Sequence, residues 1–240
     1  MDTDYVRTVS SNVVRVDVTT EGEEGNGTGL LVDNKGIIFT CEHVVRPEGQ
    51  DADSIRVVRG NQEYVPEIVK LDSERDLALL RVPDLKGEAN FVEYENVNIG
   101  EECFILGYPL RLSHLSLSKG TISAKGKRLG TQFSFELFQV DARINFGNSG
   151  GPVYQASTGK VIGIVTAKYL PFLTEVDELR KFVRELPQAP TTTVAISGIS
   201  FGPFFNYVND SVKRISDSLI KIQVGIGWLI PIHMFRHVTK

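Results

Sequence analysis

Short apolar runs, each only as long as a β-strand, dominate the first 170 residues of the chain. Turn residues such as Ser157-Thr-Gly159 close these runs, and no helix-length apolar stripe lies between them. Val14, Val16 and Val18 alternate with polar residues, which is typical of a half-buried strand. Many short strands without intervening helices favour an all-β barrel or sandwich over a βαβ fold. The clearest runs are Leu30–Val32, Ile37–Thr40, Cys103–Leu106, Phe133–Val140 and Val161–Thr166.

Composition limits the classes of partner. The chain has 240 residues, with 26 Lys and Arg against 30 Asp and Glu, and a formal net charge of -4. Nucleic-acid binding needs a cluster of cations to neutralise phosphates, so we expect no nucleic-acid partner. No stretch approaches the roughly 20 apolar residues of a membrane helix, so we expect no membrane partner. The acidic start Met1-Asp-Thr-Asp4 lacks the basic and then apolar pattern of a signal peptide, which predicts a cytoplasmic protein.

The pattern changes from strands to helices near residue 170. Thr174-Glu-Val-Asp177 is typical of a capping box and opens a helical apolar stripe, and a second stripe covers residues 204–222. Between the stripes, Thr193–Ile199 has strand character, and a further strand is predicted at Ile226–Pro231. We therefore expect a helical insertion at about 170–224 in an otherwise β protein.

Gly147-Asn-Ser-Gly-Gly151 is the sharpest chemical motif in the sequence. It fits the G-x-S-x-G nucleophile elbow, which requires a helix after the serine and the chain order Ser, Asp, His. Here the strand Val161–Thr166 follows without a helix, and the histidines downstream, His233 and His237, lie near the C-terminus. The elbow is therefore disfavoured, and the partners of Ser149 are better sought upstream.

His43 and Asp76 are the upstream candidates, His43 at the end of one predicted strand and Asp76 at the start of another. Taken alone, a histidine at a strand edge or an aspartate at a strand start is usually structural. A serine nucleophile, however, needs an imidazole to take its proton and a carboxylate to orient that imidazole. Glycines beside Ser149 also let two backbone N–H groups converge on a developing oxyanion. The three residues together therefore indicate nucleophilic catalysis.

These motifs, in this order, resemble the trypsin-like serine proteases, most closely the HtrA/Deg branch. The resemblance covers about residues 10–232, apart from the insertion. It implies an all-β fold of two six-stranded antiparallel β-barrels with the catalytic cleft between them. Residues 1–95 would form the first lobe and residues 96–240 the second, with the helical insertion in the second barrel, and both lobes would make one protease domain. The matching stretches are Gly27–Asp33, Thr40–Val45, Asp72–Leu80, Gly107–Pro109, Gly120–Ser123, Gln139–Pro152, Gly159–Ile164 and Ile226–Pro231.

The resemblance also implies roles for individual residues. His43 would act as general base and then general acid, Asp76 as the residue that orients it, and Ser149 as nucleophile through an acyl-enzyme. The oxyanion hole would come from the backbone of Gly147, Asn148 and Ser149, with the N–H groups of Gly147 and Ser149 as donors. Asn148 stands where digestive relatives carry an Asp that pairs with a freed N-terminus. An amide cannot make that ion pair, so we do not expect activation of that kind.

Four residues are candidates for the substrate pocket: Arg143, Ile144, Thr166 and Ala167. Arg143 lies where the trypsin branch places its pocket floor, and a buried cation there would select an acidic side chain before the cleaved bond. In the HtrA-like branch the next residue, here Ile144, lines an aliphatic pocket instead. We favour the second alternative, a small aliphatic side chain at that substrate position.

Some residues depart from the family pattern. Glu42 precedes His43, and a carboxylate there could raise the pKa of the imidazole, but we expect Glu42 to point to solvent. Phe146 is unusual before Gly147 and could wall the cleft. His233 and His237 have a metal-ligand spacing, yet no third ligand is evident, so we expect a solvated terminal helix, no metal and no cofactor.

Two features bear on assembly and redox state. The insertion could be a lid over the cleft, a contact in a homo-oligomer, or a packed decoration of the second barrel, and we expect no PDZ-like module after Pro231.

Cys41 and Cys103 are too few for a disulfide framework, so we expect two free thiols, with Cys41 buried.

The sequence therefore predicts a serine endopeptidase that cleaves exposed or unfolded polypeptide. Two alternatives stay open at this point. One is a peptide-binding or chaperone-like protein that keeps the protease fold without catalysis. The other is a hydrolase of non-peptide substrates, because a fold and a triad do not fix the acyl substrate.

Overall fold

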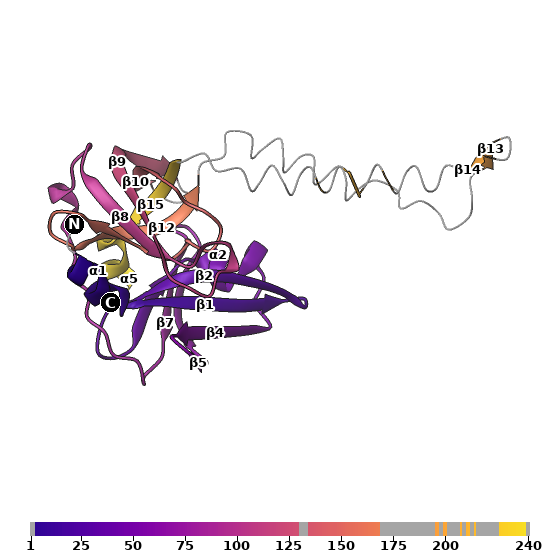
Figure 1. Cartoon of the computed structure of the whole chain (residues 1–240), viewed down its shortest axis with the longest axis horizontal. Coiled ribbons are helices and arrows are strands. Elements are labelled where there is room, and N and C mark those ends of the chain that lie inside the picture. The colour runs from indigo at the N-terminus through magenta and orange to yellow at the C-terminus, as the bar shows by residue number, and fades with distance from the viewer. Residues whose placement is uncertain are drawn as a thin grey trace. The chain divides into compact units, whose positions relative to one another are not determined.

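Two antiparallel β-sheets make up most of the described chain (Figure 1). The computed structural model describes residues 3–129, 134–168 and 226–238, and within the remaining segment residues 195–196, 199–200, 207, 210, 211 and 214. The first sheet has seven strands in the order β5-β4-β1-β2-β3-β7-β6. These strands are β1 (Val13–Thr20), β2 (Glu23–Leu31), β3 (Ile37–Thr40), β4 (Ser54–Arg59), β5 (Gln62–Tyr64), β6 (Glu67–Asp72) and β7 (Leu77–Arg81).

The first sheet has one strand more than the six expected, and Pro66 explains the difference. β5 pairs with β4 at one edge of the sheet, whereas β6 pairs with β7 at the other edge. Only Val65 and Pro66 separate β5 from β6 in the chain, so the same stretch joins both edges. Proline has no N–H for a ladder and ends the strand at this point. The stretch from 62 to 72 is thus interrupted at Pro66, and its two parts pair with opposite edges of the sheet, which curls back on itself.

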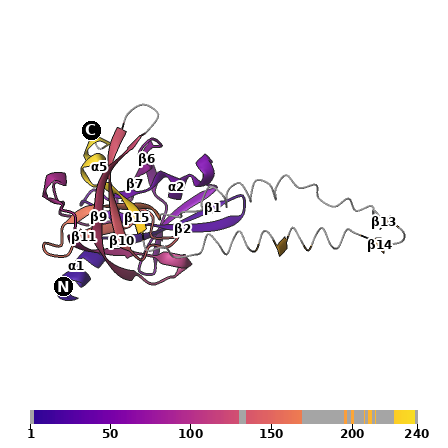
Figure 2. The ribbon, with the colours of Figure 1, turned by 90° about the horizontal axis from the view of Figure 1, so that it is seen from above.

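The second sheet is a closed barrel of six strands, as expected for this lobe. Its strands are β8 (Glu102–Gly107), β9 (Ser116–Leu129), β10 (Ser134–Ala142), β11 (Pro152–Gln155), β12 (Val161–Lys168) and β15 (Ile226–Pro231). Figure 2 shows the long β9 and β10 side by side. Alternate residues such as Ile105, Ile122 and Phe138 fill the barrel. A second apolar cluster covers the first sheet and continues over barrel residues such as Phe104 and Tyr154. The predicted lobe boundary at 95/96 falls between β7 and β8.

Outside residues 170–224, the helices of the described chain are few and short. They are α1 (Thr3–Ser10), α2 (Glu42–Val45) and α5 (His233–Val238), with single 3₁₀ turns at Pro47–Gly49, Tyr94–Asn96 and Pro109–Arg111. The expectation of a solvated terminal helix is wrong for α5, because Phe235 is fully buried and its ring stacks on Phe39 at 4.3 Å. α5 follows β15 of the barrel, so this contact joins the end of the chain to the first sheet. None of the helices in the described residues has the length and hydrophobicity that crossing a membrane requires.

The predicted insertion coincides with a separate compact unit, residues 170–224. Within it, β13 (Ala195–Ile196) pairs with β14 (Ile199–Ser200), and residues 207, 210, 211 and 214 are helical. The other residues of the two predicted helices lie outside the described residues.

Candidate active site

His43 is the second residue of α2, the single helical turn that directly follows β3 and Cys41. Val44 and Val45 of this turn are buried, while the His43 side chain is 47% exposed. Its Nδ1 lies 2.9 and 2.8 Å from the two carboxylate oxygens of Asp76, and its backbone N–H donates to Asp76 Oδ1 at 2.9 Å. Nδ1–H therefore donates to the carboxylate, and this fixes the tautomer in which Nε2 is free to accept a proton.

Asp76 lies in the turn between β6 and β7, with a left-handed φ of 58°. Aspartate tolerates this conformation better than most residues, and it brings the carboxylate under α2. The Thr166 hydroxyl, from β12 of the barrel, also donates to Asp76 Oδ2. The carboxylate thus accepts hydrogen bonds from α2, which follows the first sheet, and from β12 of the barrel. Thr166, predicted as a pocket residue, is buried and contacts the predicted triad through this bond.

Ser149 lies in the loop between β10 and β11, and the first sheet holds this loop in place. The Thr28 N–H of β2 donates to the Ser149 carbonyl oxygen at 2.8 Å, and the Gly150 N–H donates to the Val165 carbonyl oxygen at 2.8 Å. The Ser149 hydroxyl donates to the Thr166 carbonyl oxygen at 3.3 Å. Among the described residues, no hydrogen bond joins Ser149 to His43. Such bonds are often long without substrate and tighten when it binds.

The backbone around Ser149 leaves two N–H groups unbonded within the described chain, those of Gly147 and Ser149. The Asn148 N–H, by contrast, donates to the Asn145 carbonyl oxygen at 3.0 Å, so we do not count it among the oxyanion donors. Gly147 has φ 91°, and its carbonyl oxygen accepts the Thr28 hydroxyl at 2.6 Å. This bond turns the Gly147 carbonyl into the protein. Two open donors beside a hydroxyl are what an acyl-transfer site requires.

The three other predicted pocket residues lie in different environments. The Arg143 side chain is exposed, whereas Ile144 is buried in the core of the barrel. Ala167 pairs with Trp228 in the β12–β15 ladder, and its side chain lies outside the described ones. The pocket role of these residues stays a prediction.

Glu42 does not point to solvent, and this expectation is wrong. Its side chain is only 12% exposed, and its Oε1 lies 3.3 Å from Arg46 Nη1 and accepts the Ser73 hydroxyl at 2.9 Å. Arg46 lies one helical turn after Glu42, and its positive charge neutralises the Glu42 carboxylate locally.

Cys41 is a free thiol and is fully buried, as expected, and its Sγ donates to the Val165 carbonyl oxygen at 3.2 Å. Burial, together with the nearby Asp76 charge, raises the pKa of the thiol well above its usual value. The ligand atoms of Cys41, His43 and Asp76 lie within 4.8 Å of one another, a spacing that could hold a metal ion. A protonated sulfur is a poor ligand, and the other two residues already bond each other, so we assign no metal to this group.

His233 also has a structural explanation. Its Nε2 lies 3.1 Å from Glu136 Oε2, and its ring packs edge-on against Tyr94 at 5.2 Å. The side chain of His237 lies outside the described ones, so the structure does not show the second half of the predicted metal spacing.

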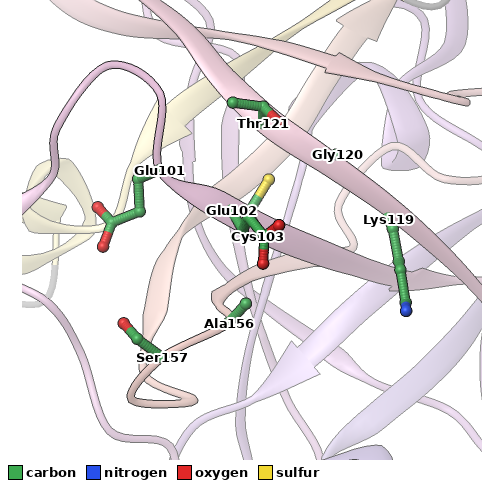
Figure 3. A pocket seen from close by; sticks show the side chains of 8 residues that line it. All are labelled: Glu101, Glu102, Cys103, Lys119, Gly120, Thr121, Ala156 and Ser157. Carbon is green, nitrogen blue, oxygen red and sulfur yellow. The ribbon is translucent and has the colours of Figure 1, made fainter. Parts of the chain in front are cut away.

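A cavity of about 630 Å³ on the barrel is lined by no residue of the predicted triad. Figure 3 shows its lining on β8 and β9 and on the turn after β11, with Glu102 and Cys103 next to each other and Lys119 to one side. Cys103 is the second free thiol, and burial raises its pKa to about 12.

The family model for the trypsin-like peptidase domain matches residues 27–164, more than half of the chain. The chain belongs to the trypsin-like peptidase family. The matched range contains His43, Asp76 and Ser149, and the fold and the serine endopeptidase class predicted from the sequence are those of this family.

Similar proteins narrow the branch of the family to the HtrA/Deg-type proteases. The chain is 41% identical over 158 residues to the magnetosome formation protease MamE of Magnetospirillum gryphiswaldense, covering 64% of this chain and 20% of MamE. It is 31% identical over 207 residues to a probable periplasmic serine endoprotease DegP-like of Rhizobium meliloti, covering 85% of this chain and 35% of that protein. The chain thus spans well under half the length of these curated relatives. The structure of the HtrA-type protease AlgW with a tripeptide superposes with a TM-score of 0.68 at 25% identity, covering 98% of this chain and 61% of that one.

Two features of the site were not predicted from the sequence. Thr28 is fully buried and connects β2 to Gly147 and Tyr108, through a hydroxyl that donates to the first and accepts the N–H of the second. The sequence does offer a signal for this role, because Thr28 is a polar residue between two glycines at the start of an apolar run. The bond from Thr166 to Asp76 joins residues 90 positions apart and left no local pattern.

Proposed function

We propose that this protein is a serine endopeptidase that hydrolyses exposed or unfolded polypeptide through an acyl-enzyme. His43 takes the proton of Ser149 as the hydroxyl attacks the peptide carbonyl, and then gives it to the leaving amine. Asp76 orients His43 and stabilises the imidazolium. The N–H groups of Gly147 and Ser149 stabilise the oxyanion.

One observation carries the proposal: both oxygens of Asp76 bond Nδ1 of His43, and Thr166, which also bonds Asp76, accepts the hydroxyl of Ser149, whose neighbouring N–H donors are open. If Asp76 only stabilised the turn between β6 and β7, it would not need to bond the ring of an exposed histidine. Family membership adds support, because its named relatives are proteases.

The direct test is cleavage of unfolded β-casein by the wild type and by Ser149→Ala, followed by mass spectrometry of the products. We expect fragments with the wild type alone, generated by internal cuts. Intact casein in both samples, with saturable binding of the casein, would instead support the non-catalytic alternative. Hydrolysis of a small ester without casein cleavage would support a non-peptide hydrolase.

A further inference from the structure

A cavity of about 270 Å³ lies between the first sheet and the segment that follows β8. β1, β2 and β4 line one side of it, and the turn after β8 lines the other. Its charged and amide-bearing lining residues are Arg15, Asp17, Glu24, Asn26, Arg56 and Arg111.

This cavity adjoins the loop of Ser149. The Asn26 side-chain amide donates to the Tyr108 carbonyl oxygen at 2.8 Å. The same carbonyl packs so closely on Gly147 that a Cβ added there would collide with it, and that Cβ would lie 3.1 Å from Asn26 Nδ2. Gly147 provides one of the two open N–H groups. The cavity therefore begins next to the position proposed for the reacting carbonyl oxygen.

The charges of the cavity are unequally neutralised. Arg15 makes two bonds of 2.7 Å to Asp17, so this pair is satisfied internally. Arg56 is 42% exposed, and its nearest partner is Glu63 at 3.7 Å. Arg111 has no ion pair or hydrogen bond with another described residue, and its guanidinium fork suits a carboxylate. Glu24 also lines the cavity, and its negative charge repels a bound carboxylate.

The turn that carries Arg111 is held in a strained conformation. Leu110 and Arg111 have φ values of 56° and 59°, a left-handed region that non-glycine residues rarely adopt. The Leu110 N–H donates to the Phe146 carbonyl oxygen at 2.7 Å, so the strained turn is bonded to the loop of Ser149. Strain of this kind persists where the surrounding structure fixes it, often at ligand sites.

The free edge of β12 sets the direction of a bound polypeptide. β12 pairs with β11 as far as Val165, whereas its pairing with β15 continues to Lys168. Within the described chain, residues 167–168 therefore keep an unpaired edge next to Ser149, and an extended peptide can add a strand to such an edge. β12 and β8 flank β11 on its two sides, and Ser149 lies just before β11. The part of the substrate before the cleaved bond is thus assigned to β12, and the part after it to the side of β8, whose following turn carries Arg111 and lines the cavity.

We propose that this cavity is a subsite for an acidic side chain of the substrate, located after the cleaved bond, with Arg111 and Arg56 binding the carboxylate. This inference rests on the proposed endopeptidase function and specifies its substrate class. Glu24 limits the selectivity of the subsite.

The test uses a quenched fluorescent peptide that the protein cleaves, remade with glutamate or glutamine at each of the first four positions after the cleaved bond. At one position we expect kcat/KM to be about threefold to fivefold higher for glutamate, the range of a partly exposed ion pair. The preference should vanish near 1 M salt, where the Debye length is about 3 Å.

Three variants assign the effect to this cavity. Arg111→Gln should remove the glutamate preference, Glu24→Gln should raise it, and Arg81→Gln, an exposed arginine of β7 outside the cavity, should leave it unchanged. Arg56→Gln replaces Arg111→Gln if the latter does not fold. Equal rates for all glutamate and glutamine pairs, or a preference that survives both cavity arginine variants, would overturn this inference alone. Failure to cleave any peptide would overturn the proposed function and this inference with it.

Discussion

The two halves of the candidate site differ in how completely their polar groups are bonded. The Asp76 carboxylate accepts the ring N–H and backbone N–H of His43 and the hydroxyl of Thr166. The Ser149 hydroxyl makes one bond of 3.3 Å, and the N–H groups of Gly147 and Ser149 have no partner among the described residues. A base must be oriented before substrate arrives, whereas oxyanion donors must stay open until substrate supplies the oxygen. The contrast is therefore what a preorganised acyl-transfer site requires.

Asp76→Asn attacks the fully bonded half and should have the largest effect. The amide would favour the wrong imidazole tautomer, so we expect kcat to fall by about 10⁴-fold with little loss of stability. Peptide hydrolysis and thermal unfolding measure the two quantities. Asp72→Asn is the matched control, because Asp72 bonds Arg75 instead of His43. Equal losses in both variants would contradict the role given to Asp76.

Gly150→Ala disturbs the loop that holds Ser149 and the open N–H groups. Gly150 has φ 83°, and an added Cβ would collide with the Thr28 carbonyl oxygen, so we expect the free energy of unfolding to fall by about 2–4 kcal/mol. Gly60→Ala is the control, because Gly60 has φ 61° but open space around it, and only the backbone cost of about 1 kcal/mol remains. Urea unfolding would contradict the account if both variants lost the same stability.

Thr166→Val sharpens the comparison, because it removes one of the three donors to Asp76 while keeping the shape of the side chain. A hydrogen bond to a charged group contributes about 1.5–3 kcal/mol, so we expect kcat to fall by about tenfold or more. Thr166→Ser should restore most of the activity, since it keeps the hydroxyl. A Ser variant as slow as the Val variant would argue that packing, and not the bond to Asp76, is what matters.

Arg143→Ala should have the smallest effect. Its side chain is exposed, and we assign the position before the cleaved bond to a small aliphatic residue, so cleavage of a peptide with valine there should change less than about twofold. Kinetics with that single peptide measure it. A large loss would favour the alternative in which Arg143 selects an acidic side chain.

Local patterns predicted the elements of the fold better than their contacts. The alternation of Val14, Val16 and Val18 correctly placed β1, because burial on one face of a strand leaves a period of two in the sequence. The extra strand of the first sheet was missed, since the interruption at Pro66 changes the partner of a strand and not its composition. α5 was interpreted as solvated from its two histidines, although Met234 and Phe235 between them supply the buried face.

For the site as well, the sequence predicted residues in local motifs better than the contacts between distant residues. His43, Asp76 and Ser149 could be proposed because each occupies a recognisable motif, and the structure brings His43 and Asp76 into contact. Glu42 was misplaced because one of its partners, Ser73, is 31 residues away and carries no motif. Contacts across sheets depend on the register of many strands, which no short segment encodes.

Active-site labelling tests the central claim most directly. The wild type and Ser149→Ala are incubated with a fluorophosphonate, and the intact mass of each is measured. We predict one covalent adduct per wild-type chain and none on the variant, because only a serine activated by His43 beside open N–H donors reacts readily. An unlabelled wild type that is folded, or equal labelling of both proteins, would contradict the assignment of Ser149 as an activated nucleophile.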